Sequence, residues 1–411
     1  MKNNKGFISI SVVYSFFLVF IAIVMSIIVV YSNRRVLINE VKNNIRDSIE
    51  NINNGVLLKD AILANNEIVT IPPDFSKVTS GLYKAEDDYG VSYYFRGADV
   101  NNYVSLKKVY DEGFSGVCLF GRCEFDNKEG KYKAYCSTKE ECIADVESGV
   151  PWTADDCVEV SLEGAYVNEY WKIIRINGDG TIRLIYSGIR DRISGGTYKH
   201  QIGESSFNPT TVDKSIWGKY TYEENGTQKD STMKTFLENW YENNLETNYS
   251  DIIADSIFCN DRELGYRSGG NQYFAVYSRI RDAASPQLTC TNKSDRYTVL
   301  DESIGNGLLK HPIGLITADE AFMAGVGFNG SNYQNNSYLI GMGTVTMSQY
   351  IISSNWPGMI QLGGSYFDFV QDKGNKKVIP VINLKADVVL KSGDGTIDSP
   401  YEIVMEEASW N

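Results

Sequence analysis

The most pronounced hydrophobic segment lies close to the N-terminus, where residues 7–31 include no charged side chain. Because a helix of about 20 apolar residues crosses the hydrocarbon core of a bilayer, this segment predicts a transmembrane helix. A buried helix of a soluble protein normally keeps one polar face. A cleaved signal peptide has a shorter apolar region, of about 7–15 residues, and a small-residue cleavage site. Here Asn33, Arg34 and Arg35 follow the apolar run. We expect an uncleaved anchor, preceded by a short cytoplasmic tail or leader at residues 1–6.

Hydrophobic positions continue beyond this segment with a helical period. They recur every three or four residues among polar and charged side chains, which is typical of an amphipathic helix. These positions are Leu37, Val41, Ile45, Ile49 and Ile52. We expect residues 32–65 to form a stalk helix that extends the anchor.

Two consecutive prolines, Pro72 and Pro73, end this helical pattern, since proline in a helix interior removes a backbone hydrogen bond. We expect an extended linker at residues 66–80. The remaining chain, residues 81–405, is expected to form the globular head.

The head contains runs rich in β-branched and aromatic residues at 91–97, 171–176 and 181–186, which predict strands. The sequence Asn-Gly-Asp-Gly at 177–180 separates the last two runs and predicts a hairpin turn. A second Gly-Asp-Gly-Thr sequence lies at 393–396. It could belong to a calcium loop, but calcium requires about six or more oxygen ligands and few acids lie nearby. A turn is the better interpretation.

Two helices interrupt this strand-rich region. Ser231 precedes apolar residues that recur with helical spacing between 233 and 241. Thr317 and Glu320 form a capping box that predicts a second helix start. Asp319 and Glu320 are adjacent acids, but a helix N-terminus favours acids through its dipole, so we do not expect them to be catalytic. The pattern predicts an α+β fold: an N-terminal transmembrane and stalk helix, then a mixed, β-rich globular head.

Charge and composition argue against several classes of function. The 411 residues have a formal net charge of −13, and a nucleic-acid-binding protein would instead carry excess Lys and Arg, so we expect no nucleic-acid partner. His200 and His311 are the two histidines of the chain, which leaves little for histidine metal sites or catalytic triads. The sequence contains no nucleophile elbow, phosphate loop or zinc-protease motif. We therefore expect no enzyme activity, no cofactor and no metal.

All seven cysteines follow the hydrophobic segment, which suits an oxidising compartment outside the cytoplasm. The positive charges on the two sides of the anchor are nearly balanced, so the cysteines decide the orientation, with the head extracytoplasmic. Disulfides fit better than zinc, because the spacing lacks the usual paired-cysteine motifs. We expect Cys259 to pair with Cys290. The cysteine-rich segment 105–165 contains Cys118, Cys123, Cys136, Cys142 and Cys157. The sequence leaves their connectivity open, and one of the five stays free or links two chains.

The N-terminal sequence Lys-Gly-Phe-Ile-Ser-Ile-Ser at 5–11, followed by an apolar run, resembles that of type IV prepilins. The resemblance implies cleavage between Gly6 and Phe7, with methylation of Phe7. Prepilins carry a glutamate at the position of Ser11, where it neutralises a neighbouring amino terminus during filament assembly. The sequence therefore leaves two alternatives: a plain signal-anchor, or a minor pilin or pseudopilin that assembles with other pilin-like subunits.

The head resembles a family of uncharacterised surface proteins of gut Firmicutes. The resemblance rests on several short motifs: Gly-Leu-Tyr-Lys at 81–84, Tyr-Tyr-Phe-Arg-Gly at 93–97, Trp-Lys-Ile-Ile-Arg-Ile-Asn-Gly-Asp-Gly at 171–180, Phe-Leu-Glu-Asn-Trp-Tyr at 236–241, Pro-Ile-Gly-Leu-Ile-Thr-Ala-Asp-Glu at 312–320 and Ile-Pro-Val-Ile-Asn-Leu-Lys at 379–385. Relatives usually have arginine at the position of Ile379. The resemblance implies a C-type-lectin-like head in which the final strands pair near the start, and it makes 105–165 a cysteine-rich insertion.

A stretch at 325–364 is rich in Gly, Asn, Ser and Tyr, which adaptable recognition loops use. The aromatic residues expected to contact a ligand, unless they are core, are Tyr333, Tyr338, Tyr350, Trp356 and Tyr366. We expect a single-pass cell-membrane protein, held by lipid contacts of its N-terminal helix, that presents a binding or adhesion head to an extracellular glycan or protein. The alternative is a pilin component.

Overall fold

The computed structural model describes most of the chain from residue 55 to residue 404. The described ranges are 55–109, 115–119, 124–126, 131–133, 138–147, 153–161, 166–189, 200–209, 211–328, 335–352, 358–371 and 374–404. The expected transmembrane segment 7–31, most of the expected stalk and the expected processing site Gly6–Phe7 lie outside them. No helix within the described ranges is long and apolar enough to span a bilayer.

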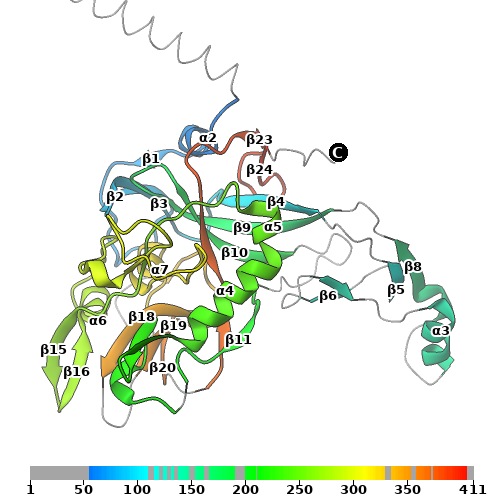
Figure 1. Cartoon of the computed structure of the whole chain (residues 1–411). Coiled ribbons are helices and arrows are strands. Elements are labelled where there is room, and N and C mark those ends of the chain that lie inside the picture. The colour runs from blue at the N-terminus through cyan, green and yellow to red at the C-terminus, as the bar shows by residue number, and fades with distance from the viewer. Residues whose placement is uncertain are drawn as a thin grey trace, which may run out of the picture. The chain divides into compact units, whose positions relative to one another are not determined.

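A large mixed β-sheet forms one layer of the head (Figure 1). Strand β9 (Tyr166–Ile176) is its longest member. One edge of β9 pairs with β3 (Gly90–Arg96) and β4 (Tyr103–Val109), and the other edge pairs with β10 (Ile182–Ile189). The remaining strands are β1 (Ile68–Val69), β2 (Gly81–Asp87), β22 (Val381–Leu384), β23 (Leu390–Ser392) and β24 (Tyr401–Ile403). The predicted hairpin at 171–186 is therefore present as β9 and β10.

The turns at both Gly-Asp-Gly sequences are fixed by their aspartates. The carboxylate of Asp179 accepts hydrogen bonds from the backbone N–H and the hydroxyl of Thr181, at 2.9 and 2.6 Å. Asp394 accepts the same pair from Thr396, at 3.1 and 2.8 Å. An aspartate that bonds its own backbone two residues on is a common turn device. The turn interpretation of both sequences is confirmed.

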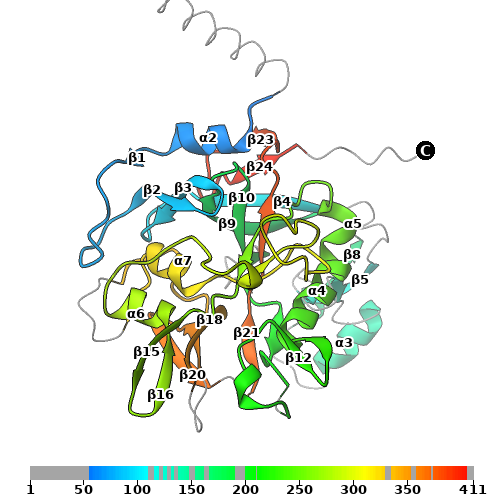
Figure 2. The same cartoon turned by 60° about the vertical axis from the view of Figure 1, so that its left-hand side comes forward.

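A second, antiparallel sheet has the order β15-β16-β18-β19-β20. Its strands are β15 (Leu264–Ser268), β16 (Asn271–Phe274), β18 (Thr344–Ile352), β19 (Gly358–Leu362) and β20 (Phe367–Gln371). Helix α7 (Ala318–Met323) contacts β3 of the large sheet and both β18 and β19 of the second sheet. Figures 1 and 2 show α7 between the two sheets, so this short helix joins them.

Both predicted helices are present, with the predicted caps. In α7, the hydroxyl of Thr317 accepts a hydrogen bond from the Glu320 backbone N–H, and the Glu320 carboxylate accepts one from the Thr317 backbone N–H. In α4 (Thr232–Asn244), the hydroxyl of Ser231 accepts from the backbone N–H of Lys234. The apolar face of α4 is buried, and Trp240 packs edge-on against Tyr186 of β10.

Short helices and two-stranded ribbons complete the described head. The helices are α2 (Leu58–Asn65), α3 (Lys139–Glu147), α5 (Glu246–Tyr249) and α6 (Ala275–Arg281). The ribbons are β5 (Ser115–Leu119) with β8 (Cys157–Ser161), β6 (Glu124–Asp126) with β7 (Lys131–Lys133), β11 (Gly203–Ser205) with β21 (Lys376–Val378), β12 (Thr221–Glu224) with β13 (Thr227–Asp230), and β14 (Phe258–Cys259) with β17 (Arg296–Tyr297). The described part of the chain is thus a strand-rich α+β fold, as predicted.

The head begins earlier than the sequence suggested. Its compact unit starts at Leu57, and α2 belongs to it rather than to a free stalk. Leu58 and Ile62 of α2 are fully buried in the main core. In the expected linker, β1 pairs with β2, and the ring of Phe75 stacks on Phe322 at 5.1 Å. Burial of these apolar side chains incorporates residues 57–80 into the head.

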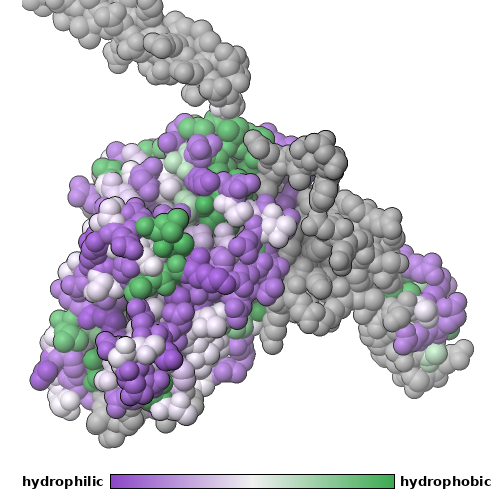
Figure 3. All heavy atoms as spheres, in the orientation of Figure 1, coloured by the Kyte–Doolittle hydropathy of each residue, from purple (hydrophilic) through white to green (hydrophobic). Residues whose placement is uncertain are grey.

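One face of the head is mostly polar. Figure 3 shows a mainly hydrophilic face on which hydrophobic side chains form separate patches. The most exposed large apolar side chains of the described residues are Leu300 and Ile71. A surface of this kind favours contacts with polar ligands over a large apolar interface.

Candidate functional site

The tyrosines expected to bind a ligand do not form an exposed surface. Tyr338 and Tyr350 are only 7% and 6% exposed. The ring of Tyr350 packs between Tyr277 and Phe369, at 5.7 and 4.6 Å. The exposure expected for Tyr338 and Tyr350 is therefore wrong, because their apolar rings are more stable inside the core. Tyr366 is half-buried.

Tyr333 and Trp356 lie outside the described residues, so their ligand contacts stay predictions. The described part of the stretch 335–364 contributes mostly core instead. All but the last residue of β18 are buried, and they include Val345, Met347 and Ile351.

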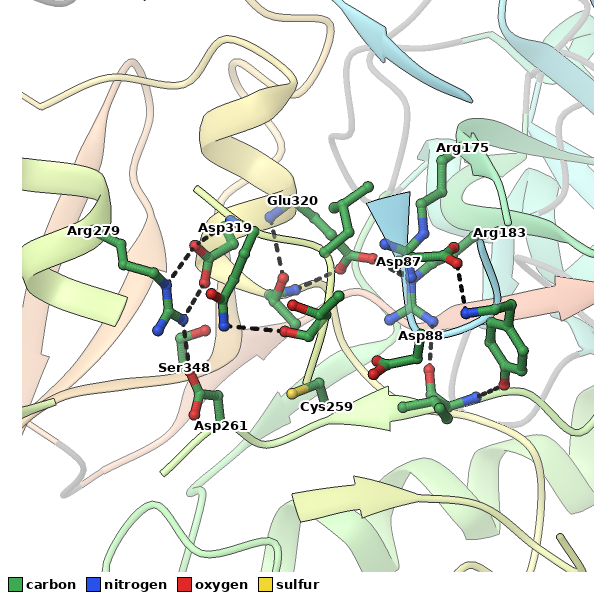
Figure 4. Close-up of a pocket in the computed structure, with 16 residues that line it drawn as sticks. Asp87, Asp88, Arg175, Arg183, Cys259, Asp261, Arg279, Asp319, Glu320 and Ser348 are labelled. Carbon is green, nitrogen blue, oxygen red and sulfur yellow. Dashed lines mark hydrogen bonds and ion pairs between the residues drawn. The ribbon is translucent and has the colours of Figure 1, made fainter. Parts of the chain in front are cut away.

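Charged side chains gather instead around the N-terminus of α7, in the interior of the head. We name this group the buried charge cluster; its members are Arg175, Arg183, Asp261, Arg279, Asp319 and Glu320. Figure 4 shows Arg279 facing Asp319 and Asp261, while Glu320 points the other way, toward Arg183 and Arg175. The capping box of α7 fixes Glu320, and Asp319 precedes it on the first turn.

The charges of this cluster are closely matched. Arg279 lies 2.6 Å from a carboxylate oxygen of Asp261 and 2.9 Å from one of Asp319. Glu320 lies 2.6 Å from Arg183 Nε and 3.5 Å from Arg175. Burial disfavours its charge, but the two guanidinium groups hold the pKa of the Glu320 carboxyl below its ordinary value.

The cavity inside the buried charge cluster has a volume of about 20 Å³. That is enough for about one water molecule and too small for a substrate. The acids here have structural partners: Asp319 pairs with Arg279, and Glu320 pairs with Arg183 and completes the capping box of α7. We regard the cluster as a polar joint between the two sheets.

A much larger open groove lies beside the β12–β13 hairpin. We name it the hairpin groove; its walls come from residues 219–228 and 292–297, with Arg262 and Leu308. Its volume is about 790 Å³, within the usual range of ligand sites, about 300–1,000 Å³. Figure 2 shows β12 at the opposite end of the head from α2. The groove is thus far from the point where the described chain begins.

The sequence builds the hairpin wall through an Asn-Gly turn. Asn225 and Gly226 both have positive φ angles, 51° and 73°. A two-residue hairpin loop requires this conformation at both positions, and Asn-Gly is the pair that adopts it most readily. The turn brings Gln228 of β13 opposite Glu223 of β12, and both line the groove.

Thr221 and Tyr297 line the hairpin groove, and we call them its floor; a network of hydrogen bonds behind them connects them to the core. The Asn260 side chain accepts a bond from the backbone N–H of Tyr220 and donates to the carbonyls of Gly218 and Met347. Tyr220 packs edge-on against Tyr297, at 5.1 Å. The hydroxyl of Tyr297 accepts from the backbone N–H of Thr221 at 3.1 Å. The floor is therefore rigidly connected to the core.

The disulfide expected from the sequence braces the same groove. Cys259 and Cys290 are joined, with Cα atoms 5.7 Å apart. Cys259 lies three positions before Arg262, and Cys290 lies two positions before Asn292. The Arg262 backbone N–H also donates to the Asp295 carboxylate at 3.1 Å. The disulfide and this hydrogen bond hold two groove-lining segments together.

A second disulfide joins Cys142 of α3 to Cys157 of β8 within the cysteine-rich insertion. Both sulfur-bearing side chains are buried together with Val117 in a small separate core. The side chains of Cys118, Cys123 and Cys136 lie outside the described part of the structure. Within the described residues, no group of three or more His, Cys, Asp or Glu side chains is arranged to hold a metal ion.

Sequence reasoning missed the hairpin groove. The Asn225–Gly226 pair was an available signal, but its flanking runs are polar and lack the alternation that marks a strand. The groove also joins segments separated by some tens of residues, which no local pattern reveals. Comparisons with protein-family models, with curated proteins and with solved structures found no match to this chain.

Proposed function

We propose that the chain is a membrane-anchored cell-surface binding protein whose extracytoplasmic head holds a ligand in the hairpin groove. The observation that carries this proposal is the groove itself: an open, polar site of about 790 Å³ on a rigid, disulfide-braced floor. Polar groups fixed on rigid elements bind with a smaller ordering cost than groups on loose loops.

The placement outside the cytoplasm has two supports. The two disulfides of the described head require an oxidising compartment for lasting stability. The uncharged residues 7–31 are long enough to anchor the chain in a bilayer.

We also propose that the head is C-type-lectin-like. In support, the final strands return to the first ones: β24 pairs with β4, and β22 pairs with β10. This return is the chain order that the resemblance of the head motifs implies. Ligand binding in the groove does not depend on that relationship, because the groove is defined by its own residues.

The test of the proposed function uses the full-length chain in detergent micelles or in its own membrane. Ser294 is exposed on the groove wall, so Ser294→Trp fills part of the groove. Ser268 is an exposed serine of β15 that does not line the groove, and Ser268→Trp is the matched control. We expect screens against glycan and protein arrays to yield a ligand that Ser294→Trp loses and Ser268→Trp retains. Equal binding by both variants would overturn the groove as the binding site.

A further inference from the structure

The ammonium group of Lys219 stands in the wall of the hairpin groove. Lys219 is half-buried, and its side chain has no hydrogen-bond or ion-pair partner among the described residues. Burial, followed by repulsion from the nearby guanidinium of Arg262, lowers the pKa of Lys219, although Asp295 partly opposes this. A partly desolvated charge of this kind gains free energy when an anion binds beside it.

The second cation of the groove is fixed in place. Arg262 donates from Nη1 to the side-chain oxygen of Gln349 at 2.7 Å, and its guanidinium lies 5.1 Å from the ring centre of Phe274. Gln349 is itself buried in β18. Arg262 therefore holds its positive charge at a set position beside Lys219, and no side-chain ordering is needed when a ligand arrives.

The acids of the groove form no ion pair with Lys219 among the described residues. Asp295 accepts from the backbone N–H of Arg262, and burial raises the pKa of the Asp295 carboxyl. Glu223 is exposed on the opposite hairpin wall. Neither carboxylate forms an ion pair with Lys219 in the described structure. An anionic group of a ligand can occupy the space next to the two cations.

The rest of the lining fits a hydroxyl-rich ligand. Gln228, Asn292 and Ser294 are exposed side chains that donate and accept hydrogen bonds. Leu308 is the apolar side chain of the lining, apart from the tyrosine rings. A peptide ligand would favour apolar pockets for its side chains, whereas a sugar favours such amides and hydroxyls.

We propose that the hairpin groove selects a carboxylate-bearing carbohydrate, such as one with a sialic or uronic acid residue, whose carboxylate binds between Lys219 and Arg262. This inference rests on the proposed function of the groove. It adds the ligand class and assigns the discriminating role to one lysine.

The experiment measures binding of purified full-length chain in detergent to two matched pairs of oligosaccharides. One pair is sialyllactose and lactose; the other is a galacturonic acid oligomer and the same oligomer after reduction of its carboxyl groups. We expect the acidic member of at least one pair to bind roughly tenfold or more tightly than its neutral partner. Added salt should weaken the acidic member more, and the pair that responds identifies the source of the carboxylate.

Lysine variants assign the effect to one residue. Lys219→Gln should remove roughly tenfold or more of the affinity for the acidic sugar and leave the neutral partner unchanged. Lys229→Gln is the matched control, because Lys229 is an exposed lysine of the same hairpin that does not line the groove. Circular dichroism and the melting temperature confirm that both variants fold.

Two results would overturn the inference. If neutral sugars bind as well as acidic ones, and Ser294→Trp abolishes both, the groove binds carbohydrate but does not select a carboxylate. If only proteins bind, and Ser294→Trp abolishes their binding, the proposed ligand class is wrong. The proposed binding function of the groove is then still supported. Loss of the proposed function is a separate result, in which Ser294→Trp changes no binding at all.

Discussion

Arg183 Nε lies 2.6 Å from a carboxylate oxygen of Glu320, and the two side chains are only 1% and 3% exposed. Arg183 belongs to β10 of the large sheet, and Glu320 belongs to α7. Their ion pair therefore joins the sheet to the helix that contacts the second sheet. A buried pair of this kind adds little net stability when compared with apolar residues, but removing one partner leaves a buried charge unpaired.

Glu320→Gln should destabilise the head by about 3 to 5 kcal/mol, because Arg183 and Arg175 then lack their acid. Glutamine can still complete the capping box, so the substitution isolates the charge. Thr317→Ala is the control for the cap alone, and it should cost about 1 kcal/mol. Chemical denaturation monitored by circular dichroism measures both. Equal losses in the two variants would show that the cap, rather than the ion pair, carries the effect.

The Glu320 carboxylate also predicts that the head loses stability at acidic pH. The pKa of Glu320 is lower in the folded chain than its ordinary value. Its contribution to stability is therefore fully present above the unfolded-state pKa, about 4.3, and is lost as the pH falls through the lower folded-state value. We expect wild-type stability to fall below about pH 4 more steeply than that of Glu320→Gln. Melting temperatures between pH 7 and pH 3 test this, and parallel curves would contradict it.

Lys172 predicts that the stability of the head also changes at alkaline pH. Its ammonium is buried, donates to the carbonyl of Tyr338 at 2.8 Å and lies over the ring of Tyr103. Burial lowers the pKa of Lys172 from 10.5 to about 8. Between these values the unfolded chain binds more protons than the folded chain, so stability should rise with pH from about 8 to about 10.5.

Lys172→Met should abolish this rise and should stabilise the head at pH 7, by at most about 3 kcal/mol. The loss of the hydrogen bond to the Tyr338 carbonyl reduces the gain. Lys84 is an exposed lysine of β2, and Lys84→Met serves as the control. Denaturation at pH 7 and pH 10 gives the comparison. A Lys172→Met variant that keeps the wild-type pH slope would place the titration elsewhere.

Several of these positions could be predicted from local sequence, since the physics that fixes them is local. The caps of α4 and α7 depend on side chains within four residues of each helix start, and the turn at Asp179 depends on a residue two positions away. Whether a side chain is buried depends instead on segments that are distant in the sequence. Tyr338 and Tyr350 lie in a stretch with the composition of a recognition loop, yet they are core, because distant strands cover them. The groove depends in the same way on long-range packing.

Removal of the Cys259–Cys290 disulfide should both destabilise the head and weaken ligand binding. The two cysteines are 31 positions apart, and closing a loop of that length stabilises a fold by about 3 to 4 kcal/mol in the chain-entropy model. Cys259→Ala with Cys290→Ala is compared with Cys142→Ala with Cys157→Ala, which removes the insertion disulfide. Only the first pair should reduce affinity at the groove. Equal loss of affinity in both would refute the bracing role.

The anchor expected at residues 7–31 predicts that the full-length chain remains in the membrane pellet after alkaline carbonate extraction. Two arginines placed in the apolar run, Ile21→Arg with Ile23→Arg, should release it, since each charge at the bilayer centre costs about 2.5 to 3.5 kcal/mol. Mass spectrometry of the N-terminal peptide distinguishes a plain signal-anchor from a processed prepilin. We expect an uncleaved N-terminus; a methylated Phe7 would instead identify a processed prepilin.

The contact between the two ends of the head sets the order in which it can fold. The side-chain amide of Asn65, at the end of α2, donates to the hydroxyl of Tyr401 in β24, 336 positions later. The backbone N–H of Leu58 donates to the carbonyl of Val388 at 2.8 Å. Because these contacts join the first and last elements of the head, a chain made from its N-terminus cannot complete them until nearly all of it has been synthesised. Until then its apolar strands are open to chaperones and proteases, so survival of the incomplete chain, as much as final stability, constrains this sequence.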